Sequence, residues 1–286
     1  MVESESRDDS SSTADLSEAT AVSRMSGDSA GDADVFRLHV PQGWRQGRGA
    51  FGGLVLGALT RAMEACEPDA DRVLRSLSGA IGAPVPAGDA EIHVRVLRRG
   101  NAVSTYEASL VRPGDGGDVL AHATAVLGRK RQDTRAWSPA APATAPSWAE
   151  LRGAVLPKGI APEFTRYFEL RPFGALPFSG GNDAVAEGYV RAVHPPRALG
   201  APELVAMADV WWPATFAIDT APRPIATVAF TLQLFTPPAP LAPERPLRHR
   251  ARAVASQDGY VVEMRELWTE SGVLLALNQQ TFVMIK

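Results

Sequence analysis

One acidic residue, Asp209, lies inside an apolar stretch of the sequence. Residues 200–216 read GAPELVAMADVWWPATF, and their apolar positions recur with the spacing of a helix that other elements surround. Burying a carboxylate in such a helix is costly unless the group is paired, hydrogen-bonded or used in a reaction. Asp209 is therefore either a local structural carboxylate or a catalytic one. Because desolvation raises the pKa of a carboxylate, a catalytic Asp209 would be suited to act as a general base.

A glycine-rich stretch, GRGAFGGLVLG, begins at Gly47. Its glycines match the GxGxxG pattern of dinucleotide-binding proteins. We reject that interpretation because residues 41–44 separate the glycines from the preceding strand and the chain does not go on to alternate strands and helices. What remains is a helix start at which the backbone N–H groups of Gly52 and Gly53 can bind a carbonyl oxygen or a phosphate.

Other catalytic patterns find little support in the sequence. It has no GxSxG nucleophile elbow, and its five histidines are too scattered to indicate a metal site or a Ser–His pair. The single cysteine, Cys66, excludes an internal disulfide and a thiolate cluster for a metal. We therefore expect neither a metal nor another bound cofactor.

The composition is that of a globular protein that acts on a small molecule. The chain has 286 residues, 45% hydrophobic and 21% charged, which suffices for one large or two ordinary domains. A net charge of −3 without a block of Lys and Arg argues against a nucleic-acid surface. No apolar run approaches the roughly 20 residues that span a bilayer, and the start of the chain lacks a signal-peptide pattern. We expect a cytoplasmic protein without nucleic-acid or membrane partners.

The elements that must position Asp209 and the two glycines follow one order twice. Residues 1–33, rich in Ser, Asp and Ala, are expected to be a disordered tail. In residues 34–131 a strand and a helix at about 51–66 precede a meander of strands, and in residues 163–286 the order recurs around the Asp209 helix. Residues 132–162, dense in Pro and Ala, are expected to be a linker. The expected strands are 35–40, 73–83, 90–97, 102–111, 119–127, 164–173, 185–193, 225–235, 249–255, 261–268 and 274–284.

Turn sequences support a duplication of this unit. Arg99-Gly-Asn in the first half corresponds to Asp258-Gly-Tyr in the second, and Gly117-Asp-Val-Leu-Ala corresponds to Gly272-Val-Leu-Leu-Ala. A sheet curled around a helix is the compact arrangement that buries both. Because each half would leave a sheet edge exposed, we expect the two sheets to join into one continuous sheet with their helices side by side. The fold class is then α+β.

From about Val35 to Lys286 the sequence resembles the double-hotdog acyl-CoA thioesterases of the thioesterase II type. The resemblance is carried by the order and spacing of short motifs, namely Phe51-Gly-Gly, Arg75-Ser, Arg98-Arg-Gly-Asn, Ala208-Asp, Ile225-Ala-Thr, Gln257-Asp-Gly and Gly272-Val-Leu-Leu-Ala with Gln280 beyond it. It implies a tandem hotdog fold, in which two antiparallel sheets each wrap a long helix. It also implies hydrolysis of acyl-CoA to free acid and CoA, with a place in fatty-acid metabolism.

In this family an Asp on the second helix, a Thr or Ser on the following strand and a Gln on the last strand hold the hydrolytic water. The matching residues are Asp209, Thr227 and Gln280. Thr231 and Gln279 are the nearest competitors, because a register change of one residue turns a strand side chain to the opposite face. Simple alternation places Thr227 and Thr231 on one face of their strand, toward the helix, and only Thr227 falls at the family's position.

Thioester hydrolysis also needs a donor for the developing oxyanion. Our hypothesis is that backbone N–H groups at a helix start, those of Gly52 and Gly53 in the other half, supply it. A hotdog dehydratase is disfavoured because neither helix region holds a His. The partner would be an acyl-CoA or another acyl-thioester such as an acyl-carrier protein, coenzyme A being part of the substrate, and the chain would form a homodimer or larger homo-oligomer. A hotdog protein that binds acyl-thioesters without turnover is the alternative, and a site filled by Phe230, Trp211 or Trp212 would favour it. If Trp211 and Trp212 instead shorten an acyl pocket, short or branched acyl groups are favoured.

Overall fold

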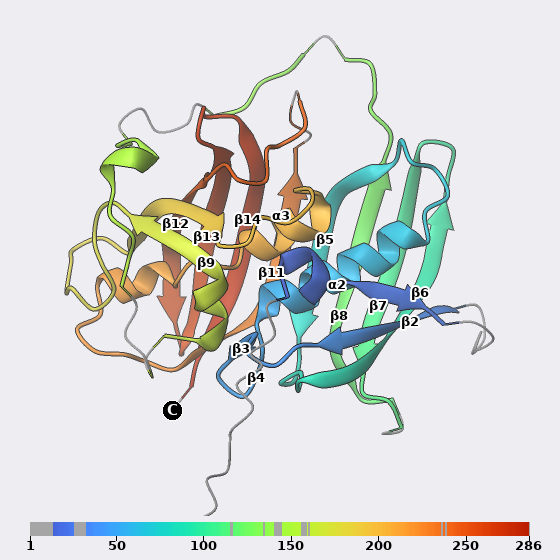
Figure 1. Ribbon diagram of the computed structural model, residues 1–286, viewed down its shortest axis with the longest axis horizontal. Coiled ribbons are helices and arrows are strands. Elements are labelled where there is room, and N and C mark those ends of the chain that lie inside the picture. The colour runs from blue at the N-terminus through green and yellow to red at the C-terminus, as the bar shows by residue number, and fades with distance from the viewer. Residues whose placement is uncertain are drawn as a thin grey trace, which may run out of the picture.

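In the part of the chain that the structure describes, twelve strands form one antiparallel sheet that curves around two α-helices (Figure 1). The computed structural model describes residues 14–25, 33–114, 117–133, 135–139, 145–155, 159, 161–235, 237 and 239–285. The strands of the sheet are β1 (Val22–Arg24), β2 (Ala33–Val40), β5 (Val73–Ile81), β6 (Gly88–Arg99), β7 (Val103–Val111), β8 (Val119–Gly128), β9 (Phe168–Pro172), β10 (Val185–Ala192), β11 (Ile225–Leu234), β12 (Leu247–Gln257), β13 (Tyr260–Thr269) and β14 (Leu274–Met284). A separate small ribbon pairs β3 (Arg45–Gln46) with β4 (Gly49–Ala50).

The strand order is the same in the two halves of the sheet. From one edge it runs β1-β2-β6-β7-β8-β5, and it continues as β11-β14-β13-β12-β10-β9 to the other edge. In each half, the inner strand and a three-strand meander follow a helix along the chain. The inner strands β5 and β11 pair with each other, from Ser76 opposite Gln233 to Ala80 opposite Ala229. The expected single continuous sheet is therefore present.

Hairpin turns close the meanders at the positions that the sequence indicates. β12 and β13 are joined by Asp258 and Gly259, whose φ angles are 54° and 82°. Two successive positive φ angles define the tight turn that matches the twist of an antiparallel hairpin, and Asp-Gly is a favoured pair there.

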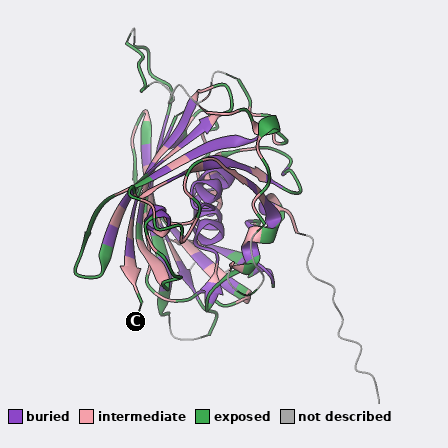
Figure 2. Ribbon diagram, turned by 90° about the vertical axis from the view of Figure 1, so that its left-hand side faces the viewer, coloured by how far each residue is buried: buried purple, intermediate pink, exposed green. Residues whose placement is uncertain are grey.

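The longer helix, α2 (Gly52–Ala65), is almost completely buried inside the curve of the sheet (Figure 2). Phe51 and Cys66 cap its two ends, so the expected helix at 51–66 is confirmed. Its apolar residues occupy all sides because β5 to β8 cover one face and the second helix covers another.

The second helix, α3 (Ala201–Met207), is much shorter than expected. The chain leaves the helix at Ala208 and passes through a turn that carries Asp209, then forms a 3₁₀ helix, η3 (Ala214–Ala217). Pro213 explains the early end, since proline has no N–H for a helical hydrogen bond and disfavours helical backbone in the residue before it. The expectation of one continuous helix over residues 200–216 was wrong.

Two glycines allow α2 and α3 to approach closely. A Cβ added at Gly53 would lie 2.7 Å from the backbone oxygen of Ala206, and one added at Gly57 would lie 2.9 Å from that of Pro202. Any side chain at these positions would push the helices apart, because real Cβ atoms do not approach backbone oxygen so closely. This contact brings the start of α2 next to the turn that follows α3.

Part of the expected disordered tail is folded. Residues 16–19 form a short helix, α1 (Leu16–Ala19), and β1 pairs with β2 at the edge of the sheet. A capping box at Asp15 and the burial of Leu16 and Ala19 stabilise this segment, and Ser17 Oγ donates to Glu203 Oε1 at 2.7 Å. Residues 1–13 and 26–32 of the expected tail lie outside the described residues, as do parts of the expected linker.

The expected strand at 164–173 is also only partly a strand. Residues 163–167 form a 3₁₀ helix, η2 (Glu163–Tyr167), and only then does β9 begin. Two aromatic stacks with the first half explain the difference, since Phe164 stacks on Phe51 at 4.0 Å and Tyr167 on Trp44 at 4.2 Å between ring centroids. These ring contacts join the two halves of the chain. The spacing of apolar residues within one segment therefore cannot predict them.

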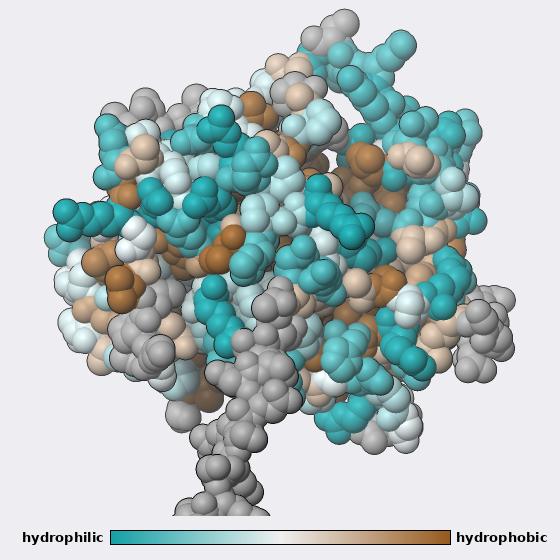
Figure 3. All heavy atoms as spheres, in the orientation of Figure 1, coloured by the Kyte–Doolittle hydropathy of each residue, from teal (hydrophilic) through white to brown (hydrophobic). Residues whose placement is uncertain are grey.

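Polar side chains cover much of the face seen in Figure 3, with apolar ones scattered among them. Within the described part of the chain, no helix has both the length and the apolar character needed to cross a bilayer.

Candidate active site

Asp209 lies in the turn directly after α3, with its carboxylate in the interior. Its backbone N–H donates to the oxygen of Ala206 at 3.0 Å, which closes the turn. The residue is 9% exposed, and the apolar residues Ala208, Val210 and Trp211 beside it are buried as well. The buried carboxylate that the sequence indicates is therefore confirmed in its setting, although it follows the helix and does not belong to it.

The last strand brings Gln280 to this carboxylate. Gln280 Nε2 donates to Asp209 Oδ1 at 2.9 Å and to Asn278 Oδ1 at 2.9 Å, while Thr227 Oγ1 donates to Gln280 Oε1 at 3.3 Å. A carboxylate only accepts hydrogen bonds, so the amino group of the amide must face Asp209 and its oxygen must face the threonine hydroxyl. The structure thus brings Asp209, Gln280 and Thr227 together in one hydrogen-bonded chain.

A β-bulge in β11 decides which threonine reaches this chain. Thr227 lies opposite Phe282 and Ala229 opposite Thr281, so the extra residue Val228 shifts the register between them. Beyond the bulge, Phe230 lies opposite Gln280 on the interior face. The expectation that alternation puts Thr227 and Thr231 on one face was therefore wrong.

The two competitors lie on the other face of the sheet. Thr231 is opposite Gln279, and Gln279 is exposed whereas Gln280 is completely buried. The register of β11 and β14 thus separates the two candidate pairs, and only Thr227 and Gln280 point toward Asp209.

The start of α2 lies against the second oxygen of Asp209. A Cβ added at Gly52 would be 2.9 Å from Asp209 Oδ2, and the backbone N–H of Gly53 donates a hydrogen bond to the carboxylate. The first half of the chain therefore contributes a helix N-terminus, with its partial positive charge, to an acid of the second half.

Two charged residues of β13 complete the surroundings of Asp209. Arg265 Nη1 lies 3.7 Å from Asp209 Oδ1, and Arg265 Nε donates to Glu263 Oε1 at 2.7 Å. Both residues are buried. Asp209 is thus surrounded by an amide, a guanidinium group and a helix start.

Burial raises the pKa of Asp209 above its ordinary value because the ionised form is desolvated. The positive charge of Arg265 and the hydrogen bonds from Gln280 and Gly53 lower this pKa, while the negative charge of Glu263 raises it further. The net shift is upward, which brings the carboxylate toward the pH range in which a general base is effective.

The sequence did not point to Asn278, Glu263 or Arg265. Asn278 Nδ2 donates to the backbone oxygen of Thr231 at 2.9 Å, so its own oxygen is held toward Gln280. Glu263 and Arg265 flank the apolar residue Met264 in β13, and Asn278 stands in a polar run of β14; such charged or polar positions are normally taken to face solvent. Only the tertiary structure shows that they face inward.

In the first half, Leu77 lies opposite Ala125, as Phe230 lies opposite Gln280 in the second half. Leu77 and Ala125 are completely buried apolar residues on neighbouring strands, β5 and β8. The first half thus provides packing where the second half provides hydrogen-bonding groups.

Trp211, two residues after Asp209, packs against strands of the second half. A Cβ added at Gly188 of β10 would lie 2.3 Å from its ring, and the indole stacks on His249 of β12 with 5.3 Å between centroids. The tryptophan therefore covers the bare backbone of β10, which accounts for its burial.

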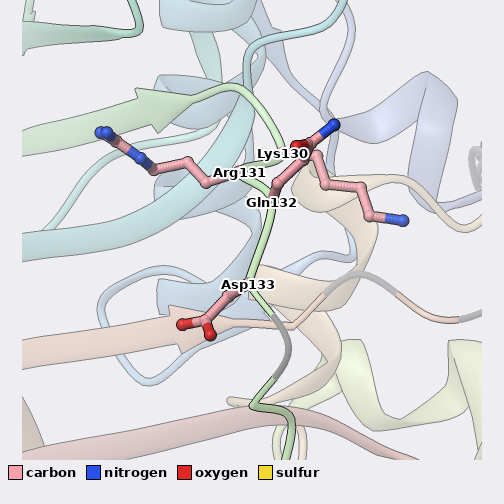
Figure 4. Close-up of a pocket in the computed structure, with 4 residues that line it drawn as sticks. All are labelled: Lys130, Arg131, Gln132 and Asp133. Atoms are coloured by element: carbon pink, nitrogen blue, oxygen red, sulfur yellow. The ribbon is translucent and has the colours of Figure 1, made fainter.

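A surface cavity of the described structure lies apart from Asp209. Among the described residues, no group of three His, Cys, Asp or Glu side chains could hold a metal ion. Lys130, Arg131, Gln132 and Asp133, which follow β8, line a surface cavity of about 790 Å³ (Figure 4). The hydrogen-bonded chain at Asp209 is thus a separate feature of the molecule.

Family models match almost the whole folded part of the chain. The model of the acyl-CoA thioesterase N-terminal domain matches residues 40–128, and that of the C-terminal domain matches residues 120–284. The chain belongs to the acyl-CoA thioesterase family. It is therefore a thioester hydrolase, and Asp209, Thr227 and Gln280 all lie within the matched C-terminal domain.

Solved structures show that this thioesterase has the hotdog fold. A protein with a hot dog fold from Alicyclobacillus acidocaldarius is 23% identical, with a TM-score of 0.82 over 95% of this chain and 98% of that one. The acyl-CoA thioesterase II TesB2 from Mycobacterium marinum is 17% identical, with a TM-score of 0.72 over 94% of this chain and 98% of that one. No curated protein matches the chain by sequence.

The fold is also found in proteins with other activities. The dehydratase domain of RzxB from Pseudomonas fluorescens is 13% identical, with a TM-score of 0.57 over 91% of this chain and 97% of that one. The fold alone therefore does not identify the reaction, and the family assignment rests on the matched domain models.

Proposed function

We propose that this thioesterase hydrolyses acyl-CoA thioesters to a free acid and CoA, using a water molecule held by Asp209, Thr227 and Gln280. The observation that carries the proposal is the hydrogen-bonded chain from Thr227 through Gln280 to Asp209. Its three members come from β11, β14 and the turn after α3, and an acid with a raised pKa stands at its end.

In the proposed reaction, Asp209 takes a proton from the water as its oxygen attacks the thioester carbonyl carbon. The threonine hydroxyl donates a hydrogen bond to Gln280 Oε1, so the threonine oxygen can still accept a hydrogen bond from the water. The carbon–sulfur bond then breaks, and CoA leaves as a thiolate that takes up the proton. General base catalysis of this kind contributes roughly 100- to 10,000-fold.

The developing oxyanion would be stabilised by the start of α2. Gly53 already donates its N–H to Asp209, which makes the N–H of Gly52 the better donor for the substrate. The partial positive charge of the helix start favours a negative oxygen at the same place. The site would then be built by both halves of the chain.

The repeated strand order supports a tandem of two hotdog domains. We assign residues 34–131 to the first domain, 132–162 to a linker and 163–286 to the second, which carries the catalytic residues. In each half, two strands of the sheet precede the helix and four strands follow it. A homodimer or larger assembly and a cytoplasmic location, which suits a chain with one cysteine, complete the proposal.

Release of free thiol from acyl-CoAs, from acetyl to palmitoyl, tests the proposal. We expect turnover by the wild type, a loss of about 100- to 10,000-fold in Asp209→Asn, and a smaller loss in Gln280→Ala. Both variants should still bind acyl-CoA and remain folded by circular dichroism. Full turnover in folded Asp209→Asn would refute the proposed site.

The alternative substrates and the binding-only function give different results in the same assay. Turnover of an acyl-carrier-protein thioester without turnover of acyl-CoA would identify another thiol carrier. Binding of acyl-CoA without turnover of either substrate would identify a protein that binds acyl-thioesters only.

A further inference from the structure

Strand β13 places two charged side chains beneath the turn that carries Asp209. Glu263 and Arg265 are two residues apart, so both point to the interior face of the sheet. Their side chains are 0% and 2% exposed, and Arg265 Nε donates to Glu263 Oε1 at 2.7 Å. They form a fully buried ion pair.

This pair contacts the turn at both of its ends. Arg265 Nη1 donates to the backbone oxygen of Ala208 at 3.2 Å, and Glu263 Oε2 accepts from the backbone N–H of Ala214 at 2.7 Å. The turn over residues 208–214 is thus held by two neighbouring side chains of one strand. Asp209 lies inside this span, 3.7 Å from Arg265.

We propose that Glu263 and Arg265 are positioning residues for the hydrolysis. They hold the turn so that Asp209 meets Gln280, and their opposite charges set how readily the Asp209 carboxylate takes up a proton. This inference rests on the proposed function, because the pair acts through Asp209.

Energetics favour this role over a purely structural one. A buried ion pair adds little stability compared with apolar side chains of the same size, because both charges lose their hydration. A buried ion pair can contribute to function when its charges act on a third group, which here is the carboxylate of Asp209. Arg265 favours the ionised form of Asp209 and offsets part of its desolvation, whereas Glu263 favours the protonated form.

The other elements around Asp209 contribute neutral groups. Gln280 of β14 and the N–H of Gly53 in α2 donate hydrogen bonds to the carboxylate. His249 of β12 lies near Arg265, and burial followed by the charge of Arg265 lowers its pKa well below the ordinary value, so it is uncharged at neutral pH. The field at Asp209 is therefore set by the two charges of β13.

Substitution of each charge alone gives opposite predictions. In Arg265→Gln, the acidic limb of the kcat/KM profile should move to higher pH by about one to three units, because the favourable charge is lost and Glu263 is left unpaired. In Glu263→Gln, the limb should move to lower pH. Arg265→Lys, which keeps a positive charge, should restore part of the first shift, and the double variant should fall between the single ones.

A carbon-13 titration of the Asp209 carboxylate gives a second readout that does not depend on turnover. The midpoint of this titration should shift in each variant in the same direction as the acidic limb of the kcat/KM profile. Arg248→Gln, which removes a buried arginine of β12 whose guanidinium group lies over the ring of Phe173, is the matched control and should shift neither.

The outcomes separate the inference from the proposed function. The inference is overturned if the variants fold but the acidic limb of kcat/KM and the titration midpoint of the Asp209 carboxylate both remain at their wild-type pH. If Arg265→Gln does not fold, Glu263→Gln and the double variant carry the test. Turnover retained in Asp209→Asn would instead overturn the proposed function, and the carboxylate titration would still decide whether the pair controls Asp209.

Discussion

Gln280 Nε2 lies 2.9 Å from Asp209 Oδ1, and this hydrogen bond joins the last strand of the sheet to the turn after α3. The same amide accepts from Thr227 and donates to Asn278, so its orientation is held from three sides. A side chain with this many partners is pre-organised, and it can hold a water molecule without first having to reorient.

Gln280→Ala should reduce kcat by on the order of 10- to 100-fold, since about 1–3 kcal/mol is lost when one partner of a buried hydrogen bond is removed. KM should change less, because the amide holds the water and not the acyl group. Gln279→Ala is the matched control: it lies one residue away on the exposed face and should leave kcat unchanged. Equal losses in the two variants would mean that damage to β14, and not the loss of the amide, lowers the rate.

Thr227→Val should lower kcat by about 5-fold or more while keeping the shape of the side chain, because a hydroxyl hydrogen bond contributes roughly 1 kcal/mol or more. Thr227→Ser keeps the hydroxyl and should retain most of the activity. Thr231→Val removes a hydroxyl from the opposite face of β11 and serves as the control. A larger effect at Thr231 than at Thr227 would reverse our assignment. Steady-state thiol release measures all three variants.

Most elements could be predicted from the sequence because their periodicity is local. The helix α2 and the meander strands follow from spacings of three to four and of two residues, which depend on burial along one element. The bulge at Val228 could not be predicted, because it lies in a run with neither Gly nor Pro to indicate it. Simple alternation without the bulge places Thr227 and Thr231 on one face of the strand. Only the family's pattern then distinguished the two threonines.

The inward direction of β13 could not be predicted either. Its outward residues Tyr260, Val262 and Met264 are apolar, whereas its inward residues include Glu263 and Arg265. The usual rule would place the charged residues in solvent. The charges face inward because each is paired there and contacts the turn at Asp209, which depends on residues about fifty positions away in the sequence.

Gly52→Ala should impair catalysis with little loss of folding. The new Cβ would lie 2.9 Å from Asp209 Oδ2 and 3.0 Å from Ile81 Cδ1. The Ile81 side chain can move, but the carboxylate can shift only by weakening its bond to Gln280, so kcat should fall on the order of 10- to 100-fold. Gly82→Ala, where a Cβ meets nothing nearer than 3.8 Å, should retain wild-type kcat. Unchanged kcat in Gly52→Ala would show that the carboxylate tolerates displacement.

Gly53→Ala should act on stability instead. Its Cβ would lie 2.7 Å from the backbone oxygen of Ala206 and 2.4 Å from Phe51 Cζ, so α2 and α3 would have to separate. The free energy of unfolding should fall by about 1–3 kcal/mol, as in other overpacked cores. Thermal unfolding of the Gly52 and Gly53 variants side by side measures the difference, and equal stabilities would contradict the close approach of the helices.

Glu64 on α2 makes the stability of the fold depend on pH. Burial raises the pKa of Glu64 to about 7, the charge of Arg61 opposes this shift, and the charge of Glu203 adds to it. Because the pKa is higher in the folded state than its ordinary value of 4.5, the folded protein binds the proton more tightly. The stabilising contribution of the protonated side chain is therefore fully present below about pH 4.5 and is lost as the pH rises through about 7.

Glu64→Gln should remove this dependence, since glutamine stays neutral at every pH. The variant should gain stability relative to the wild type as the pH rises from about 5 to about 8, and the difference should level off above that range. Urea unfolding of both proteins across this range measures the effect. A difference that stays constant from about pH 5 to about pH 8 would show that Glu64 ionises as easily in the folded protein as in the unfolded chain.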